Sequence, residues 1–197
     1  MTTHRFATAA LALTGAALTT LIATASAPSP QTRPAAATHR TPVELGGYLV
    51  SSMGCHDCHT PWKLGPKGPE PDMSRALTGH PEDLKMPPAP ALPPGPWIAS
   101  FAATNTAWAG PWGVSFTANL TPDKDTGLGD WTEAQFIAAI RTGRHQGKGR
   151  AILPPMPYPA YANLVDEELK AIWAYLRSLA PVKNRVPQPI DPPETQR

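Results

Sequence analysis

The residues best suited to chemistry in this sequence are two cysteines and a histidine that lie close together. Cys55 and Cys58 are separated by two residues, and His59 follows the second thiol directly. Each thiol of such a pair can add across one vinyl group of a haem, and the histidine that follows can ligate the iron. The spacing therefore predicts covalent attachment of one haem c, with His59 as an axial iron ligand.

Two other uses of the cysteine pair fit the sequence less well. A thioredoxin-like redox disulfide lies between a strand and a helix, and no strand pattern precedes Cys55. A zinc site needs four ligands, but the chain has only two cysteines, and outside the N-terminal region and the motif its histidines are scattered at His80 and His145. His56, inside the motif, is interpreted as a spacer. Haem attachment is the favoured interpretation.

Residues 1–27 have the features of a secretory signal peptide. A weakly basic start at Arg5 precedes an apolar run over residues 6–22 and the small residues Ala25-Ser26-Ala27. The alternative is an uncleaved anchor, but the run is rich in Ala and Thr and falls short of the ~20 strongly apolar residues that a spanning helix needs. We expect an exported, periplasmic protein with residues 28–40 as a flexible linker and no stable membrane span once the signal is removed.

The composition limits the remaining chain to one domain that contains much loop. Removal of residues 1–27 leaves about 170 residues with 16 basic and 15 acidic side chains, a net charge of +1. The 26 prolines and 15 glycines exclude a simple bundle of long helices. A net charge so close to zero gives no indication of binding to nucleic acid or to a membrane surface.

The first predicted helix leads into the cysteine motif. It runs over residues 42–53, and Thr41 and Glu44 have the types and spacing of a capping box at its start. Gly46 and Gly47 lower the helix propensity by about 1 kcal/mol each. We interpret them as the place where another helix approaches closely.

Two further helices are predicted in the second half of the chain. One begins at the capping sequence Asp130-Trp131-Thr132-Glu133 and ends at Gly143. The other begins with the acidic turn Asp166-Glu167-Glu168 and ends before Pro181. Their apolar residues, which recur at helical spacing, are Phe136, Ile137, Ile140, Leu169, Ile172, Trp173, Leu176 and Leu179.

A methionine lies between these two helices in the proline-rich segment 152–159. The prolines hold the chain in a rigid extended conformation, so Met156 can project its thioether with little freedom. We predict Met156 as the sixth iron ligand. His80 or His145 would instead give a bis-histidine iron, and an open sixth position would give a haem enzyme or a gas sensor.

Four further motifs carry a family resemblance. They are Thr117-Ala118-Asn119-Leu120-Thr121-Pro122-Asp123, Thr126-Gly127-Leu128-Gly129-Asp130-Trp131, Pro155-Met156-Pro157-Tyr158 and Ala174-Tyr175-Leu176-Arg177-Ser178-Leu179. With the cysteine motif, they make the chain resemble a class I c-type cytochrome over residues 41–60 and about 114–182. The closer resemblance is to the haem domains of cytochrome subunits that serve membrane-bound alcohol and sugar dehydrogenases.

The resemblance implies an all-α fold with a few helices around one covalently bound haem. It also implies His59 and Met156 as axial ligands, and a crossing of the first and last helices, with residues 46–48 against Trp173 and Leu176. The chain departs from the family pattern because it has one haem motif where those subunits carry several. It therefore resembles a free-standing module. Val165 also stands where such domains often have a Ser or Thr cap, so Asn163 or the acidic turn that follows would replace it.

Residues 41–182 are predicted to form the cytochrome domain, with a Pro-rich loop insertion over residues 64–106 and a Pro-rich tail over residues 183–197. The insertion is expected to have little regular structure, since eleven prolines lie between Pro61 and Pro96. Aromatic residues indicate that its second half packs, as a docking surface, a lid, or a cover over one haem face. These residues are Trp97, Phe101, Trp108 and Trp112.

Together these features predict a monohaem electron carrier with no substrate chemistry of its own. Its expected partners are redox proteins: a dehydrogenase that it serves as an accessory, another cytochrome, or an oxidase. The rival hypothesis is a haem enzyme or gas sensor whose sixth ligand is open or displaceable. Basic residues that could steer an acidic partner, and that solvation explains equally well, are Lys63, Lys67, Arg144, Lys148 and Arg150.

Overall fold

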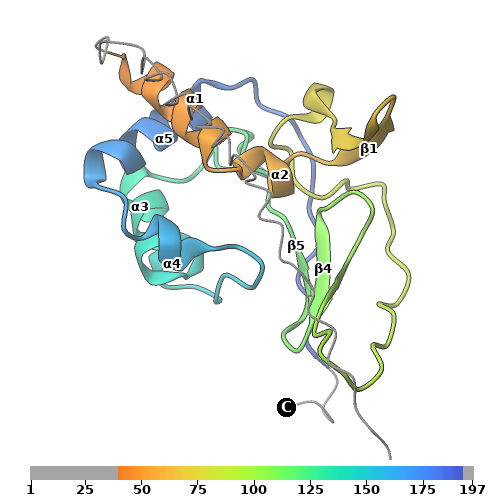
Figure 1. The fold of residues 1–197 in the computed structure, drawn as a ribbon. Helices are drawn as coiled ribbons and strands as arrows, with labels where there is room; N and C mark the ends of the chain where they lie inside the picture. The colour runs from red at the N-terminus through yellow and green to blue at the C-terminus, as the bar shows by residue number, and fades with distance from the viewer. Residues whose placement is uncertain (1–39, 193–197) are drawn as a thin grey trace, which may run out of the picture. The chain divides into compact units, whose positions relative to one another are not determined.

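The structure, a computed structural model, describes residues 40–192. The predicted signal peptide, nearly all of the predicted linker and the last five residues lie outside this range. Three longer helices make up one part of the fold: α1 (Pro42–Ser52), α3 (Glu133–Thr142) and α5 (Asp166–Ser178) (Figure 1). Single helical turns also occur at α2 (Cys55–His59), α4 (Tyr158–Tyr161), Met73–Arg75 and His145–Gly147.

The helix starts follow the predicted capping chemistry. At α1 the Thr41 hydroxyl accepts a hydrogen bond from Glu44 N at 3.3 Å, and the Glu44 carboxylate accepts one from Thr41 N at 2.8 Å. At the start of α3 Thr132 and Gln135 form the same reciprocal pair, two residues later than the predicted capping sequence, which begins at Asp130 and ends at Glu133. At α5 the side chain of Val165 cannot accept, and the Glu168 carboxylate takes the Val165 N–H at 3.1 Å. The acidic turn therefore replaces the missing cap.

Helices α1 and α5 cross as expected, and the contact depends on one glycine. A Cβ at Gly46 would lie 1.9 Å from the Ala171 carbonyl oxygen and 2.7 Å from Tyr175 Cβ. The closest approach therefore falls on Ala171 and Tyr175 rather than on the predicted Trp173 and Leu176. Those two side chains belong to the buried core, whose larger members are Leu49, Val50, Leu77, Leu128, Phe136, Ile140, Leu169, Ile172, Trp173 and Leu176.

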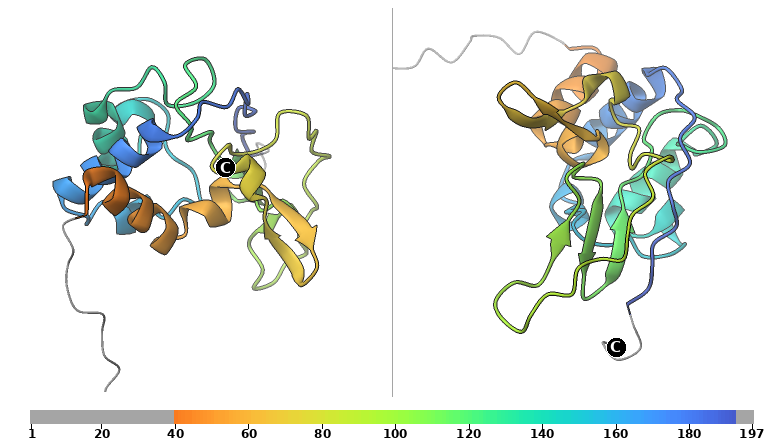
Figure 2. Two further views of the ribbon diagram at one scale, coloured as in Figure 1. Left: turned by 90° about the horizontal axis from the view of Figure 1, so that it is seen from above. Right: turned by 90° about the vertical axis from the view of Figure 1, so that its right-hand side faces the viewer.

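The prediction of an all-α fold is wrong, because the described residues also form two antiparallel sheets. Strand β1 (Trp62–Gly65) pairs with β2 (Gly68–Pro71). A second sheet joins β3 (Ser100–Phe101), β4 (Ala107–Gly110) and β5 (Gly113–Phe116) in that order. In Figures 1 and 2 these hairpins lie on the opposite side of α2 from the three longer helices.

Both tight hairpins turn at the same local sequence, Gly-Pro-x-Gly. The turns are residues 65–68 and 110–113, and the two glycines of each turn are partners in the ladder. Proline suits the first corner of such a turn, and the final glycines, Gly68 and Gly113, adopt φ of 118° and 90°. Prolines therefore occur in the turns and in strand β2, and the insertion over residues 64–106 has little regular structure beyond β2, the end of β1, the turn Met73–Arg75 and β3.

The remainder of the insertion stays outside regular structure, and residues 85–98 are exposed. Trp97 is 77% exposed and Phe101 62% exposed. Phe101 stacks on Trp108 with ring centroids 4.7 Å apart. These rings lie on the sheet, and none of the four aromatic residues singled out in the sequence lines the cavity described below.

The first part of the predicted tail packs against the domain. Asn184 is 5% exposed, and its amide donates to the carbonyl oxygens of Thr78 and His80 at 2.7 and 2.8 Å. Ile190 exchanges backbone hydrogen bonds with Val114 in β5 at 2.8 and 2.9 Å.

Among residues 40–192, no helix is long and apolar enough to cross a membrane.

Candidate haem site

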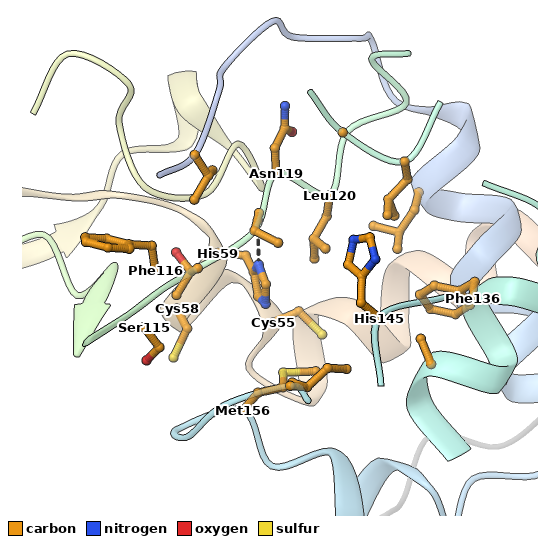
Figure 3. Close-up of a pocket in the computed structure, with 18 of the residues that line it drawn as sticks. Cys55, Cys58, His59, Ser115, Phe116, Asn119, Leu120, Phe136, His145 and Met156 are labelled. Atoms are coloured by element: carbon orange, nitrogen blue, oxygen red, sulfur yellow. Dashed lines mark hydrogen bonds between the residues drawn. The ribbon is translucent and has the colours of Figure 1, made fainter. Parts of the chain in front are cut away.

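The cysteine motif forms helix α2, a single turn that begins where the chain changes direction after α1. Gly54 makes this change at φ 72°. Cys55, Cys58 and His59 line a cavity, and Figure 3 shows their side chains on its wall. His59 is 8% exposed, and its ring Nδ1 lies 2.8 Å from the Ala118 carbonyl oxygen. This contact requires Nδ1–H as the donor and leaves the Nε2 lone pair for a metal.

The environment of His59 favours the neutral ring. Burial lowers the pKa of His59 below its ordinary value, and neutral imidazole is the form that ligates a metal. His56 behaves differently, because its Nδ1 is hydrogen-bonded to the Thr60 hydroxyl at 2.9 Å and the residue does not line the cavity. The structure is consistent with its interpretation as a spacer.

Both cysteines are free and partly buried. Burial raises the pKa of the Cys55 thiol to about 11, and it also raises the pKa of Cys58. Reactive redox cysteines have a depressed pKa because a positive environment stabilises the thiolate. These two thiols lack that environment, which disfavours a catalytic dithiol.

Met156 reaches the same cavity from a segment far along the chain, the loop over residues 152–157 (Figure 3). This loop is attached on two sides. The Ser115 hydroxyl of β5 donates to the Pro154 carbonyl oxygen at 2.5 Å, and the Tyr161 hydroxyl of α4 donates to the Met53 carbonyl oxygen at 2.8 Å. The four predicted site residues, Cys55, Cys58, His59 and Met156, are thus brought to one cavity.

The two alternative histidine ligands have different positions. His80 is fully buried, and its two ring nitrogens contact the Thr106 hydroxyl at 2.9 Å and the Leu84 carbonyl oxygen at 3.2 Å. It does not line the cavity. His145 does line it, and its ring packs edge-on against Trp131 with centroids 4.7 Å apart. Of the two, only His145 faces the candidate site.

The cavity suits a haem in size and in lining. Its volume is about 830 Å³, within the ~300–1,000 Å³ typical of cofactor sites. The Thr117 hydroxyl, on the cavity wall, is buried without a hydrogen-bond partner in the described part of the chain. A polar ligand atom would satisfy it. The apolar side chains of the wall include Val50, Leu120, Leu128, Phe136, Ile140, Ile152, Leu153, Leu169, Ile172 and Leu176.

Sequence reasoning missed several residues around this cavity. Ala118 and Thr117 belong to a motif noted for its family resemblance, but nothing in the sequence assigns a role to them. Ser115 and Tyr161 had no recognisable signal, because their partners lie 39 and 108 positions away. The charged residues of the wall are Glu82, Lys85, Lys124, Asp125, Asp130, Arg150 and Arg185. Of the basic residues that the sequence suggested for steering an acidic partner, only Arg150 lies on this wall.

Comparison with known proteins shows which proteins the chain resembles. No family model matches the chain. It is 44% identical over 75 residues to the gluconate 2-dehydrogenase cytochrome c subunit of Pantoea cypripedii, a match that covers 38% of this chain and 17% of that protein. It is 29% identical over 141 residues to the fructose dehydrogenase cytochrome subunit of Gluconobacter japonicus, covering 72% and 22%. It is 35% identical over 80 residues to the cytochrome c subunit of the quinone-dependent alcohol dehydrogenase of Gluconobacter oxydans, covering 39% and 16%.

The chain resembles a c-type cytochrome, and its similarity extends to the cytochrome c subunits of dehydrogenases. This similarity supports electron transfer as the role of the chain and haem c as its cofactor. The chain spans between 16% and 22% of the length of the three relatives described above. Activities and partners of those whole proteins are therefore not transferred to it directly.

Proposed function

We propose that this protein is an exported monohaem cytochrome c that carries single electrons between redox proteins. Cys55 and Cys58 form the thioether links, and His59 and Met156 are the axial iron ligands. The proposal of one haem is supported by the sequence, since these 197 residues contain a single Cys-x-x-Cys-His motif and no other cysteine.

One observation carries the proposal: two segments distant in sequence deliver both thiols, an oriented imidazole and a thioether to one cavity that is lined mainly by apolar side chains. The hydrogen bond from His59 to Ala118 supports ligation, because ligating histidines commonly donate their second ring N–H to a backbone carbonyl. An apolar wall also suits an electron carrier, since it excludes water and raises the reduction potential.

The bound haem supplies an iron that gains and loses one electron. The residues of the chain serve this exchange by holding the two proposed iron ligands, His59 and Met156, in fixed positions. His59 is fixed by Ala118 O, and Met156 by the attachment of its loop to β5. Ligands that do not rearrange between the two oxidation states keep the transfer rapid, and a Met ligand favours a higher potential than a second His.

The proposed partners are a dehydrogenase that donates electrons and a second cytochrome or an oxidase that accepts them. The similarity to dehydrogenase subunits supports the donor class. We place the protein in the periplasm, on the basis of the signal features of residues 1–27 and the covalent haem chemistry that takes place after export. The cations on the cavity wall, which include Lys85, Arg150 and Arg185, would face a partner near the haem edge.

The experiment compares visible spectra and reduction potentials of the haem-loaded protein and two variants. Met156→Ala is expected to lose the far-red sulfur-to-iron band, lower the potential and bind carbon monoxide in the ferrous state. His145→Ala is the matched control, because His145 lies on the same cavity wall and is not the proposed ligand. It is expected to keep the band and the potential.

Three other results would refute parts of the proposal. Loss of low-spin iron in His145→Ala alone would make the iron bis-histidine. Wild-type protein that is high-spin and binds carbon monoxide readily would make it a haem enzyme or gas sensor. Haem that is removed by acid-acetone extraction would exclude the thioether links to Cys55 and Cys58.

A further inference from the structure

The loop that carries Met156 has little capacity to hold itself in place. Pro154, Pro155 and Pro157 have no N–H group, so they cannot contribute donors to local turns. Ile152 N donates to Gly143 O at 2.8 Å at the start of the loop. Beyond that point, the position of Met156 depends on groups supplied by other elements.

Two hydroxyl groups from distant elements supply these contacts. Ser115 of β5 is 8% exposed, and its Oγ lies 2.5 Å from Pro154 O, two residues before Met156. Its other acceptor within reach, Trp108 O, is at 3.4 Å, so the shorter contact dominates. This hydrogen bond attaches the loop to the three-stranded sheet.

The second hydroxyl attaches the loop to the haem-binding helices. Tyr161 is half-buried in α4, five residues after Met156, and its hydroxyl donates to Met53 O at 2.8 Å. Met53 directly follows the last residue of α1 and lies two residues before Cys55, so the contact joins the sixth-ligand loop to the segment that carries the attachment motif. The two hydrogen bonds bracket Met156 on both sides.

We propose that Ser115 and Tyr161 are positioning residues that hold Met156 on the iron and keep the sixth position closed to other ligands. The inference rests on the proposed function, in which Met156 is the axial ligand. A thioether is a neutral and weak donor, so its bond to iron depends on a high local concentration of sulfur. A loop fixed at two points supplies that concentration, and a loop released at one point samples positions in which the sulfur is off the iron. The sheet absent from the sequence prediction thus acquires a role in ligation.

The test uses Ser115→Ala, Tyr161→Phe and the double variant, each loaded with haem. The probes are imidazole for ferric protein and carbon monoxide for ferrous protein. Each single variant is expected to bind imidazole about tenfold more tightly than wild type. This corresponds to a change of about 1.4 kcal/mol in the equilibrium between Met156 on the iron and Met156 off the iron. The double variant is expected to show a further increase, with a weaker far-red band and a lower potential.

Matched controls come from the C-terminal end of α5. Ser178→Ala removes a hydroxyl that donates to Tyr175 O at 2.7 Å, and Tyr175→Phe removes a hydroxyl from a ring that packs on Gly47. Both are expected to bind imidazole as wild type does. A purely structural role of Ser115 and Tyr161 would lower the unfolding temperature without changing imidazole affinity or potential. Ser115→Thr, which keeps a hydroxyl, is expected to bind imidazole with wild-type affinity.

The outcomes separate this inference from the proposed function. If wild type shows the far-red band and both variants bind imidazole with wild-type affinity, Met156 is the ligand and the positioning role is overturned. If wild type lacks the band, the proposed ligation and the positioning role both fail. Tyr161→Phe removes one oxygen atom, so it remains an informative variant should Ser115→Ala fail to accumulate.

Discussion

Replacement of Gly46 by alanine tests whether the α1–α5 crossing limits the stability of the domain. The new Cβ would lie 1.9 Å from the Ala171 carbonyl oxygen, where an ordinary contact begins at 3.4 Å, so the two backbones must part by about 1.5 Å. Overpacking of this kind costs about 1–3 kcal/mol, and a clash with rigid backbone belongs at the upper end. Alanine also gains about 1 kcal/mol of helix propensity.

The net expectation for Gly46→Ala is a loss of about 2 kcal/mol in the free energy of unfolding. For a domain of this size that equals a melting temperature lower by about 4–8 °C. Gly47→Ala is the matched control, because its Cβ would lie 3.1 Å from the Tyr175 ring, a side chain that can shift. That variant is expected to be unchanged or up to about 1 kcal/mol more stable.

The assay is urea unfolding of the ferric, haem-loaded proteins, followed by far-ultraviolet circular dichroism. The comparison of Gly46→Ala with Gly47→Ala cancels the common gain in helix propensity and the loss of glycine flexibility in the unfolded chain. Equal midpoints for the two variants would refute the close crossing. A more stable Gly46→Ala would also do so.

Three further predictions concern caps, buried amides and pH. Val165→Ser is expected to stabilise α5 by about 1 kcal/mol, because the serine hydroxyl can cap the helix, whereas Val165→Ala is expected to give no such gain. Equal thermal unfolding midpoints for the two variants would contradict this prediction. Asn184→Ala leaves two buried carbonyl groups, including that of Thr78, without their donor. The free energy of unfolding, measured in urea, is expected to fall by about 2–3 kcal/mol. An unchanged midpoint would show that water replaces the amide. Burial lowers the pKa of His80, so the unfolded chain binds a proton more readily and stability should fall as pH drops below about 6.5. The free energy of unfolding should depend less steeply on pH in His80→Gln than in wild type. An identical slope would show that other groups cause the pH dependence.

Local sequence signals predicted the helical half of the fold well. The capping box at Thr41 and the stop at Gly143 appear where they were predicted, since capping depends on residues three or four positions apart. The cysteine motif and its neighbouring helix are equally local. The Met156 loop was recognised from its prolines, and the structure brings it to the cavity that Cys55, Cys58 and His59 line.

The strands were missed because their formation depends on pairing and not on local pattern. Four-residue strands such as β1 and β4 carry too little alternation to be recognised, and the prolines in β2 argued against a strand. The repeated Gly-Pro-x-Gly sequence at residues 65–68 and 110–113 was the available signal. It marks a turn, but a turn alone does not specify a hairpin.

The sequence by itself determined which groups are available for the proposed chemistry, because thiol spacing, the adjacent imidazole and a thioether among prolines are properties of short segments. Only the tertiary structure decided what surrounds that chemistry. Ala118 orients His59 across 59 positions, and Ser115 and Tyr161 hold the Met156 loop across 39 and 108 positions. Contacts between such distant residues arise when helices and sheets pack, and no pattern within one segment encodes them.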